Sequence, residues 1–402
     1  MTRTRTRFGP LAATASSAPD LDIDALIDDP ATGIIVCCGS GGVGKTTTSA
    51  ALGLRAAERG RKVVVLTIDP ARRLAQSMGI EELDNTPRPV EGLSWANGAR
   101  RDGVPRMDAM MLDMKRTFDE VVESQATPEK AKQILENPFY IALSSSFAGT
   151  QEYMAMEKLG QIHQQAREDQ SYDLIVVDTP PSRSALDFLD APERLSSFLD
   201  GRFMRLLLAP ARGPARLMTA GFNMVTKAVT TIIGGQVLHD MQAFVSAFDT
   251  LFGGFRQRAQ RTFELLQADG TSFLVVAAPE PDALREAAYF VERLSEEQMP
   301  LAGLVVNRAS VDPEVGLSSA AAMSGYEKLR DSSDDASRMA AGLLRLHADR
   351  KLAVERETRL RGRFATAHPD VATVVLPALP TDVHDLAGLR RIGALLSGDG
   401  AA

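Results

Sequence analysis

The stretch GSGGVGKTT, residues 39–47, decides how this chain folds. It matches the pattern G-x-x-x-x-G-K-S/T and lies between an apolar run, GIIVCCG (33–39), and an alanine-rich segment, TTTSAALGLRAAERG (46–60). A strand, a glycine-rich loop and a helix in this order form a phosphate-binding loop. The glycines let backbone N–H groups converge on phosphate oxygens at the positive end of the helix dipole. The sequence therefore predicts that this unit binds a nucleotide.

The loop residues have separate expected roles. Lys45 is expected to reach the β- and γ-phosphates, and the hydroxyl of Thr46 is expected to bind Mg²⁺. Thr47 is placed to donate a hydrogen bond to the α-phosphate. The residues expected to surround the phosphates are Gly41, Gly42, Val43, Gly44, Lys45, Thr46 and Thr47.

Further apolar runs rich in β-branched residues follow the loop. They are KVVVLTID (62–69), YDLIVVDTPP (172–181), SFLVVAAP (272–279), LAGLVVNR (301–308) and VATVVLPALP (371–380). Such runs are typical of strands that are covered on both faces, and helical segments separate them. We therefore predict an α/β fold with a doubly wound, mainly parallel sheet.

The rest of the chain predicts one large domain with helical additions. Residues 1–30 are expected to be a disordered tail, and 31–402 to form a single phosphate-loop domain. The intervals 102–168 and 191–269 carry no strand signal, so we expect helical insertions there.

Composition excludes several classes of function. The net charge is −7, with 52 acidic and 45 basic residues, which disfavours general attraction to nucleic acid or anionic lipid. The two cysteines are adjacent, Cys37 and Cys38, so neither a disulfide framework nor a zinc-binding C-x-x-C is supported. No run of 18 apolar residues occurs. We expect a cytoplasmic protein that reaches a membrane only through a partner.

Two aspartates end predicted strands at the edge where doubly wound sheets bind ligands. A carboxylate at Asp69 can orient and deprotonate an attacking water, although an Asp-Pro after a strand is by itself more typical of a helix-capping turn. Asp178 can hold Mg²⁺ through a water, and its alternative is a helix N-cap. The Thr179–Pro181 turn can sense the γ-phosphate and move on hydrolysis.

Together these motifs resemble the arsenite-pump ATPase (ArsA) family. The matching segments are GSGGVGKTT, DPA (69–71), DTPPSRSALDFL (178–189), APEPDALREA (278–287) and VVNR (305–308). That family includes the ATPase that targets tail-anchored membrane proteins, and it belongs to the deviant Walker A class of dimeric ATPases. The resemblance covers about residues 34–396 and is weaker in the helical insertions.

The resemblance implies ATP and Mg²⁺ as cofactors and gives roles to individual residues. It implies that Asp69 is catalytic together with Lys45, and that Asp178 belongs to the second switch at the metal. Glu280 matches a glutamate that contacts the nucleotide, and Asn307 matches the asparagine that recognises adenine. Taken alone, Glu280 would be a helix-start acid and Asn307 a strand-end turn residue. Pro377 and Pro380 fall where the family's last loop closes over the base.

The chain also departs from the family pattern. Ser40 stands where the class has a lysine that reaches the partner's nucleotide, the eukaryotic C-x-x-C is absent, and SRSA (182–185) replaces TGHT. Loss of such a positive charge typically costs about 10³-fold in rate. The expected assembly is a slow homodimer, or a heterodimer with an ArsA-like paralogue that carries the lysine.

The apolar part of the second insertion permits two interpretations. It can form a groove for a hydrophobic client helix or membrane protein, or it can pack internally. The residues concerned are Met204, Leu206, Leu207, Leu208, Leu217, Met218, Phe222 and Met224. The leading function is an ATP-hydrolysing switch, and the alternatives are a weakly active regulatory subunit and a partition-type ATPase. Nucleic-acid and arsenite binding are not expected.

Overall fold

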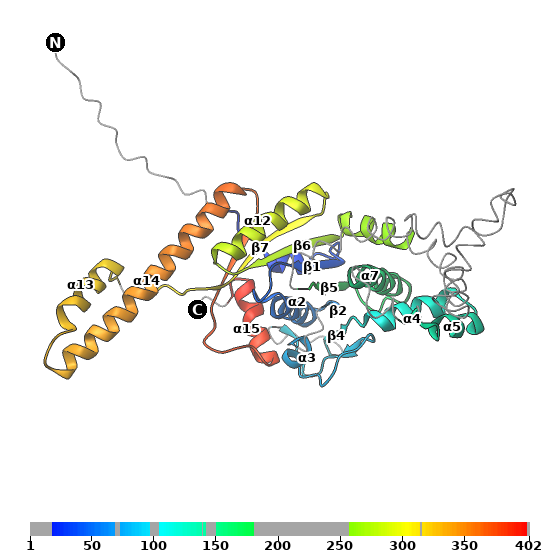
Figure 1. The fold of residues 1–402 in the computed structure, drawn as a ribbon, viewed down its shortest axis with the longest axis horizontal. Helices are drawn as coiled ribbons and strands as arrows, with labels where there is room; N and C mark the ends of the chain where they lie inside the picture. Colours follow the sequence, from blue (N-terminus) through cyan, green and yellow to red (C-terminus); the bar gives the residue numbers. More distant parts are fainter. Residues whose placement is uncertain are drawn as a thin grey trace, which may run out of the picture.

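The central feature is a mixed sheet whose strands are almost all parallel (Figure 1). The structure is a computed structural model that describes residues 18–68, 73–96, 104–138, 140–141, 150–180, 257–313 and 316–399. In this part of the chain the strand order is β3-β4-β2-β5-β1-β6-β7-β8, and only the β3–β4 pair is antiparallel. The strands are β1 (Ile34–Cys38), β2 (Lys62–Thr67), β3 (Arg88–Pro89), β4 (Arg106–Met111), β5 (Leu174–Asp178), β6 (Thr271–Ala277), β7 (Leu301–Ala309) and β8 (Thr373–Pro377).

Helices cover both faces of this sheet, which confirms the predicted doubly wound α/β fold (Figure 1). One apolar core joins the sheet to α1 (Ile23–Asp28), α2 (Lys45–Arg59), α3 (Arg73–Met78) and α15 (Leu386–Leu396). The core on the opposite face includes α4 (Met114–Gln125), α5 (Pro128–Leu135), α7 (Thr150–Asp169) and α12 (Pro281–Glu296). Strands buried on both faces explain why their sequences are continuous apolar runs rather than alternating ones.

The prediction that 102–168 contains no strand is wrong at β4. This strand, RMDAMM, pairs in parallel with β2, from Lys62 opposite Arg106 to Thr67 opposite Met111. It lacks β-branched residues and contains a charged residue, Asp108, so its local sequence gives little strand signal. Asp108 is only 7% exposed and accepts hydrogen bonds from the hydroxyl of Tyr172 and from Arg106, which is how the strand tolerates a carboxylate.

The prediction of a disordered tail over 1–30 is wrong for its described part, residues 18–30. The carboxylate of Asp22 caps α1 by accepting from the backbone N–H of Ala25 at 2.9 Å. Ile23 and Ile27 lie on one face of α1 and are fully buried. The preceding residues extend the sheet, because Thr373 donates to the carbonyl of Pro19 at 2.7 Å. The sequence before this short amphipathic helix is basic and rich in threonine, so the whole N-terminal segment was predicted to be disordered.

Two other helical regions complete the described chain. Residues 257–267, at the end of the second predicted insertion, are helical, and 191–256 lie outside the described residues. The charged segment after β7 forms α13 (Ser319–Leu329) and the long α14 (Asp335–Ala367), a helical hairpin that projects from the sheet (Figure 1). Within the described part of the chain, no helix is both long and apolar enough to cross a membrane.

Candidate functional site

The site lies where the sheet changes its winding direction. β1 is hydrogen-bonded to β5 on one side and to β6 on the other. The chain continues from β1 to β2 on the β5 side of the sheet and from β6 to β7 on the opposite side, so the connections leave these two neighbouring strands in opposite directions. The carboxyl ends of β1, β5, β7 and β8 point to the same edge because the strands are parallel. Ligands of doubly wound sheets bind in the crevice at such a point. The predicted site residues therefore converge by topology, although they are far apart in sequence.

The phosphate loop needs glycine at two positions where the backbone approaches other atoms. A Cβ on Gly39 would lie 2.1 Å from the carbonyl oxygen of Val276, and one on Gly44 would lie 2.2 Å from Nδ2 of Asn307. Gly44 also has φ 97° and occupies the N-cap position of α2. Since glycine has no side chain with which to cap, the first amides of α2 face the loop, ready for an anion.

Lys45, the first residue of α2, is buried inside the loop. Its side chain is 5% exposed, and its Nζ donates to the carbonyl oxygen of Ser40 at 2.9 Å. An ammonium held against a carbonyl of the same loop lies within reach of an incoming phosphate. Ser40 contributes this carbonyl but no charge, so Lys45 is the cationic side chain that the loop itself carries.

Asp178 is joined directly to the phosphate loop. Its carboxylate is fully buried, and Oδ2 accepts hydrogen bonds from the hydroxyls of Thr46 at 2.7 Å and Thr67 at 2.9 Å. Thr67 ends β2 and pairs in register with Asp178 at the end of β5. The carboxylate of Asp178 thus accepts from one hydroxyl of the phosphate loop and from one hydroxyl of the neighbouring strand.

The Thr46–Asp178 pair has the chemistry of a magnesium site. Hydroxyl and carboxylate oxygens are the hard ligands that Mg²⁺ prefers, and Mg²⁺ in such sites uses few protein ligands together with phosphate oxygens. A buried carboxylate beside the loop supplies negative charge where a cation is needed. The residues present therefore fit the ion, and Thr46 and Asp178 are the ones that would hold it.

Asn307 lies at the end of β7 and contacts the loop. The residue is 8% exposed, its Nδ2 donates to the carbonyl of Val43 at 2.8 Å, and its Oδ1 accepts from the backbone N–H of Arg308 at 2.9 Å. A primary amide has two donor hydrogens and two acceptor lone pairs, so each end keeps capacity for one more hydrogen bond. These two contacts fix the orientation of the amide.

The larger of the two cavities that adjoin the loop, called the main cavity below, has a volume of about 560 Å³ and runs from the loop to the segment after β8. This volume suits a nucleotide-sized ligand. Asn307, Arg308, Pro377 and Leu379 lie along its wall, whereas Pro380 does not line it. From the loop and the start of α2 it is lined by Gly42, Gly44, Lys45, Thr46 and Thr47.

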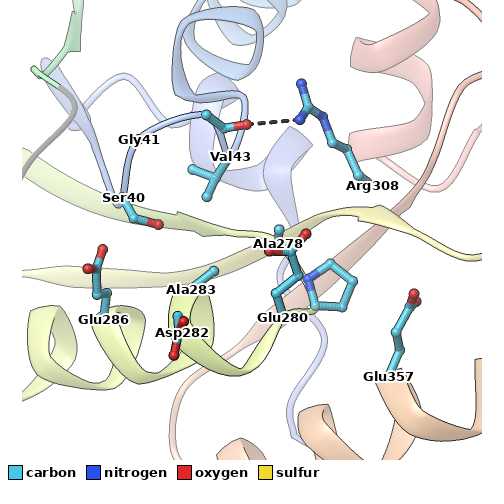
Figure 2. Close-up of a pocket in the computed structure, with 12 residues that line it drawn as sticks. Ser40, Gly41, Val43, Ala278, Glu280, Asp282, Ala283, Glu286, Arg308 and Glu357 are labelled. Atoms are coloured by element: carbon cyan, nitrogen blue, oxygen red, sulfur yellow. Dashed lines mark hydrogen bonds between the residues drawn. The ribbon is translucent and has the colours of Figure 1, made fainter. Parts of the chain in front are cut away.

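Glu280 lies in a second cavity, of about 360 Å³, on the Ser40 side of the loop. Figure 2 shows Ser40 to Val43 on one wall and the start of α12, with Glu280 and Asp282, on the other. Glu280 occupies the N-cap position of α12, which matches its alternative role as a helix-start acid. Glu280 thus lines a different cavity from Lys45 and Asn307, and among the described residues Gly42 and Arg308 line both cavities.

Some predicted residues cannot be placed. Asp69, the SRSA segment and the apolar residues between Met204 and Met224 lie outside the described residues. Thr67 and Arg308 are among the residues at the site that were not predicted. Thr67 ends a strand beside Asp178, and Arg308 donates to the carbonyl of Gly42 at 2.9 Å. A polar residue at the carboxyl end of a predicted strand is the signal that would have indicated both.

The two cysteines are structural. Cys37 and Cys38 are fully buried in β1, and burial raises the pKa of the Cys37 thiol to about 12 and raises that of Cys38 further. Thiols with such pKa values remain protonated at neutral pH and are poor nucleophiles and metal ligands.

Comparison with known proteins gives one consistent family. A family model described as anion-transporting ATPase matches residues 32–324. The chain is 23% identical over 301 residues to the ATPase ASNA1 homolog 2 of Paramecium tetraurelia, covering 70% of this chain and 78% of that protein. It is 27% identical over 276 residues to the ATPase get3 of Aspergillus terreus, covering 67% and 71%. It is 24% identical over 314 residues to the ATPase ARSA2 of Chlamydomonas reinhardtii, covering 75% of each.

The family match spans the phosphate loop, both strands that hold Asp178 and Thr67, and the strand that carries Asn307. It therefore includes every element that lines the main cavity except the end of β8, the segment after it and α15. The chain belongs to the anion-transporting ATPase (ArsA) family and is an ATPase.

Proposed function

We propose that this chain binds ATP with Mg²⁺ in the main cavity and uses its hydrolysis to control a dimer that acts on a client or membrane partner. The observation that carries the proposal is the Thr46–Asp178 pair at the base of the phosphate loop, joined at 2.7 Å. A hydroxyl from the loop and a carboxylate from a neighbouring strand are the two protein groups that phosphate-loop ATPases place at the metal.

The residues at the phosphate loop then have defined tasks in the proposed reaction. The loop N–H groups and Lys45 hold and neutralise the phosphates, and Asn307 offers a donor and an acceptor to the adenine edge. Mg²⁺, when bound by Thr46 and Asp178, would polarise the phosphate oxygens. Water oxygen bonds to the γ-phosphorus as the bond to ADP breaks, and Asp69 is the proposed acceptor of the water proton.

The end of β5 supports a connection between the nucleotide and the rest of the molecule. Thr179 follows Asp178 directly, and its hydroxyl donates to the carbonyl of Cys37 in β1 at 2.8 Å. Along the sequence, the chain continues from here to the predicted insertion at 191–269, which contains the residues proposed for a client groove, between Met204 and Met224. A shift of Asp178 upon loss of the γ-phosphate would therefore act on the start of that segment.

Ser40 favours a second candidate, a regulatory subunit with slow turnover. The loop carries no lysine at this position, and the cavity in front of it is bordered by Glu280, Asp282, Glu286 and Glu357. Those carboxylates do not supply the positive charge that the transferred phosphoryl group needs. We propose slow hydrolysis in a homodimer, and faster hydrolysis with a paralogous partner that brings a lysine.

The experiment is calorimetric titration with ATP, with and without Mg²⁺, together with phosphate release at saturating ATP. We expect magnesium-dependent binding that Lys45→Ala abolishes, and the exposed Lys132→Ala variant serves as a matched control for loss of one lysine. Absence of magnesium-dependent binding to the folded wild-type chain would refute the proposal. Binding with negligible hydrolysis would favour the regulatory subunit.

A further inference from the structure

Arg308 is the residue at the loop whose placement is most unusual. Its backbone has φ 61°, a left-handed conformation that is strained for any residue except glycine. The pairing between β7 and β8 shifts register between Val306 and Ala309, so Asn307 and Arg308 form a bulge. Bulges next to active sites re-aim side chains that a regular strand would direct elsewhere.

The bulge directs two consecutive side chains onto two consecutive carbonyls of the loop. Nη1 of Arg308 donates to the carbonyl of Gly42 at 2.9 Å, and Nδ2 of Asn307 donates to that of Val43 at 2.8 Å. Figure 2 shows the guanidinium reaching the loop from the strand end. The guanidinium of Arg308 therefore lies at the carbonyl next to the one that Asn307 contacts, and both side chains approach the loop from the same strand end.

Arg308 also borders the apolar end of the main cavity. That end is formed by Pro377, Ala378 and Leu379. Ala309 pairs with Pro377, and its carbonyl accepts from the backbone N–H of Ala378 at 2.8 Å, so the two strand ends are held side by side. A planar cation and an apolar segment next to a fixed amide make a slot suited to a flat aromatic base, because guanidinium planes stack on base rings.

We infer that Arg308 stacks its guanidinium on the adenine ring of the nucleotide bound in its own chain. It is thereby a residue that determines affinity for the base, next to Asn307, which contacts the edge of the ring. This inference rests on the proposed function of the main cavity. The hydrogen bond to Gly42 holds the guanidinium plane of Arg308 in position. The left-handed backbone of Arg308 is what allows its side chain to reach the loop.

The test compares two ligands with the same number of phosphates, ADP and pyrophosphate, each titrated calorimetrically with Mg²⁺ into the full chain. Arg308→Gly removes the side chain while accepting the left-handed backbone, so its melting midpoint should be no lower than that of the wild type. Arg308→Lys keeps the positive charge but lacks the planar guanidinium group that could stack on a base. Arg338→Ala, in α14 and outside both cavities, is the matched control.

We expect both Arg308 variants to bind ADP about 10-fold more weakly, the size of a partly desolvated cation–π contact, and to bind pyrophosphate within twofold of the wild type. Parallel losses for ADP and pyrophosphate would show that the guanidinium serves the phosphates and would overturn the inference. ADP affinity retained in Arg308→Lys, or in both variants, would overturn it as well. A wild-type chain that binds neither ligand would instead refute the proposed function.

Discussion

Replacing Asp178 by asparagine should separate the metal site from the stability of the fold. The carboxylate is fully buried and accepts two hydroxyl hydrogen bonds through Oδ2, from Thr46 and Thr67. An asparagine carbonyl can accept the same two bonds. Each of these two hydrogen bonds becomes weaker by about 1 kcal/mol because its acceptor is no longer charged, which costs about 2 kcal/mol in total. The neutral amide, however, avoids the desolvation cost of a buried charge, which is several kcal/mol. We therefore expect the free energy of unfolding without nucleotide to stay the same or rise.

The same substitution should impair magnesium-dependent hydrolysis severely. A unit charge about 4 Å from another is worth roughly 4 kcal/mol at the effective dielectric of a protein site, and each 1.36 kcal/mol is tenfold in rate. Loss of one carboxylate charge near the metal thus predicts a fall of about 10³-fold in phosphate release at fixed Mg²⁺. Steady-state phosphate release over a magnesium titration measures it, and urea denaturation measures the unfolding free energy.

Asp108→Asn is the matched control, because Asp108 is also a strand carboxylate with little exposure, but its hydrogen bonds come from Tyr172 and Arg106 and not from the phosphate loop. It should leave phosphate release unchanged. If Asp178→Asn stays folded and keeps hydrolysis within about fivefold, or if Asp108→Asn loses as much, the assignment of Asp178 to the metal is wrong.

Three further predictions test other parts of the molecule. Ser40→Lys should raise the hydrolysis rate of the chain alone by about 10³-fold, because it restores the missing positive charge, whereas the neutral Ser40→Gln should not. If the wild type and Ser40→Lys release phosphate at equal rates, the role given to position 40 is wrong. Ile27→Ala should lower the free energy of unfolding by about 2–5 kcal/mol in urea denaturation, since Ile27 is fully buried in α1; a change below about 0.5 kcal/mol would show that α1 does not belong to the core. Neither cysteine of the native protein should react with a thiol reagent at pH 8, because burial raises the pKa of Cys37 from 9.0 to about 12, and both should react after denaturation. Rapid labelling of the native protein at pH 8 would contradict the burial of β1. The buried, protonated thiol of Cys37 also contributes to the free energy of unfolding: this contribution is complete below pH 9.0 and is lost as the pH rises toward about 12.

The sequence specified the elements whose signals are local. The glycines of the loop, the alanine-rich α2 and the β-branched runs each carry their own pattern, so the strand–loop–helix unit and six of the strands followed directly from it. β4 and α1 were missed because RMDAMM has no strand propensity and six residues of α1 are too few to stand out from a polar start. Both are stabilised by burial against elements remote in sequence, which local propensity does not include.

Only the tertiary structure decided which side chains meet at the loop. Asn307 and Val43 are 264 positions apart, and Arg308 and Gly42 are 266 apart, yet each pair is hydrogen-bonded across parallel strand ends. The separation of Glu280 into a second cavity and the left-handed backbone of Arg308 likewise depend on strand order and on one register shift. The sequence alone determined that a phosphate-binding loop forms, because that requires only neighbouring residues. The composition of the surrounding site depends on which strands pair, a long-range property of the packed sheet.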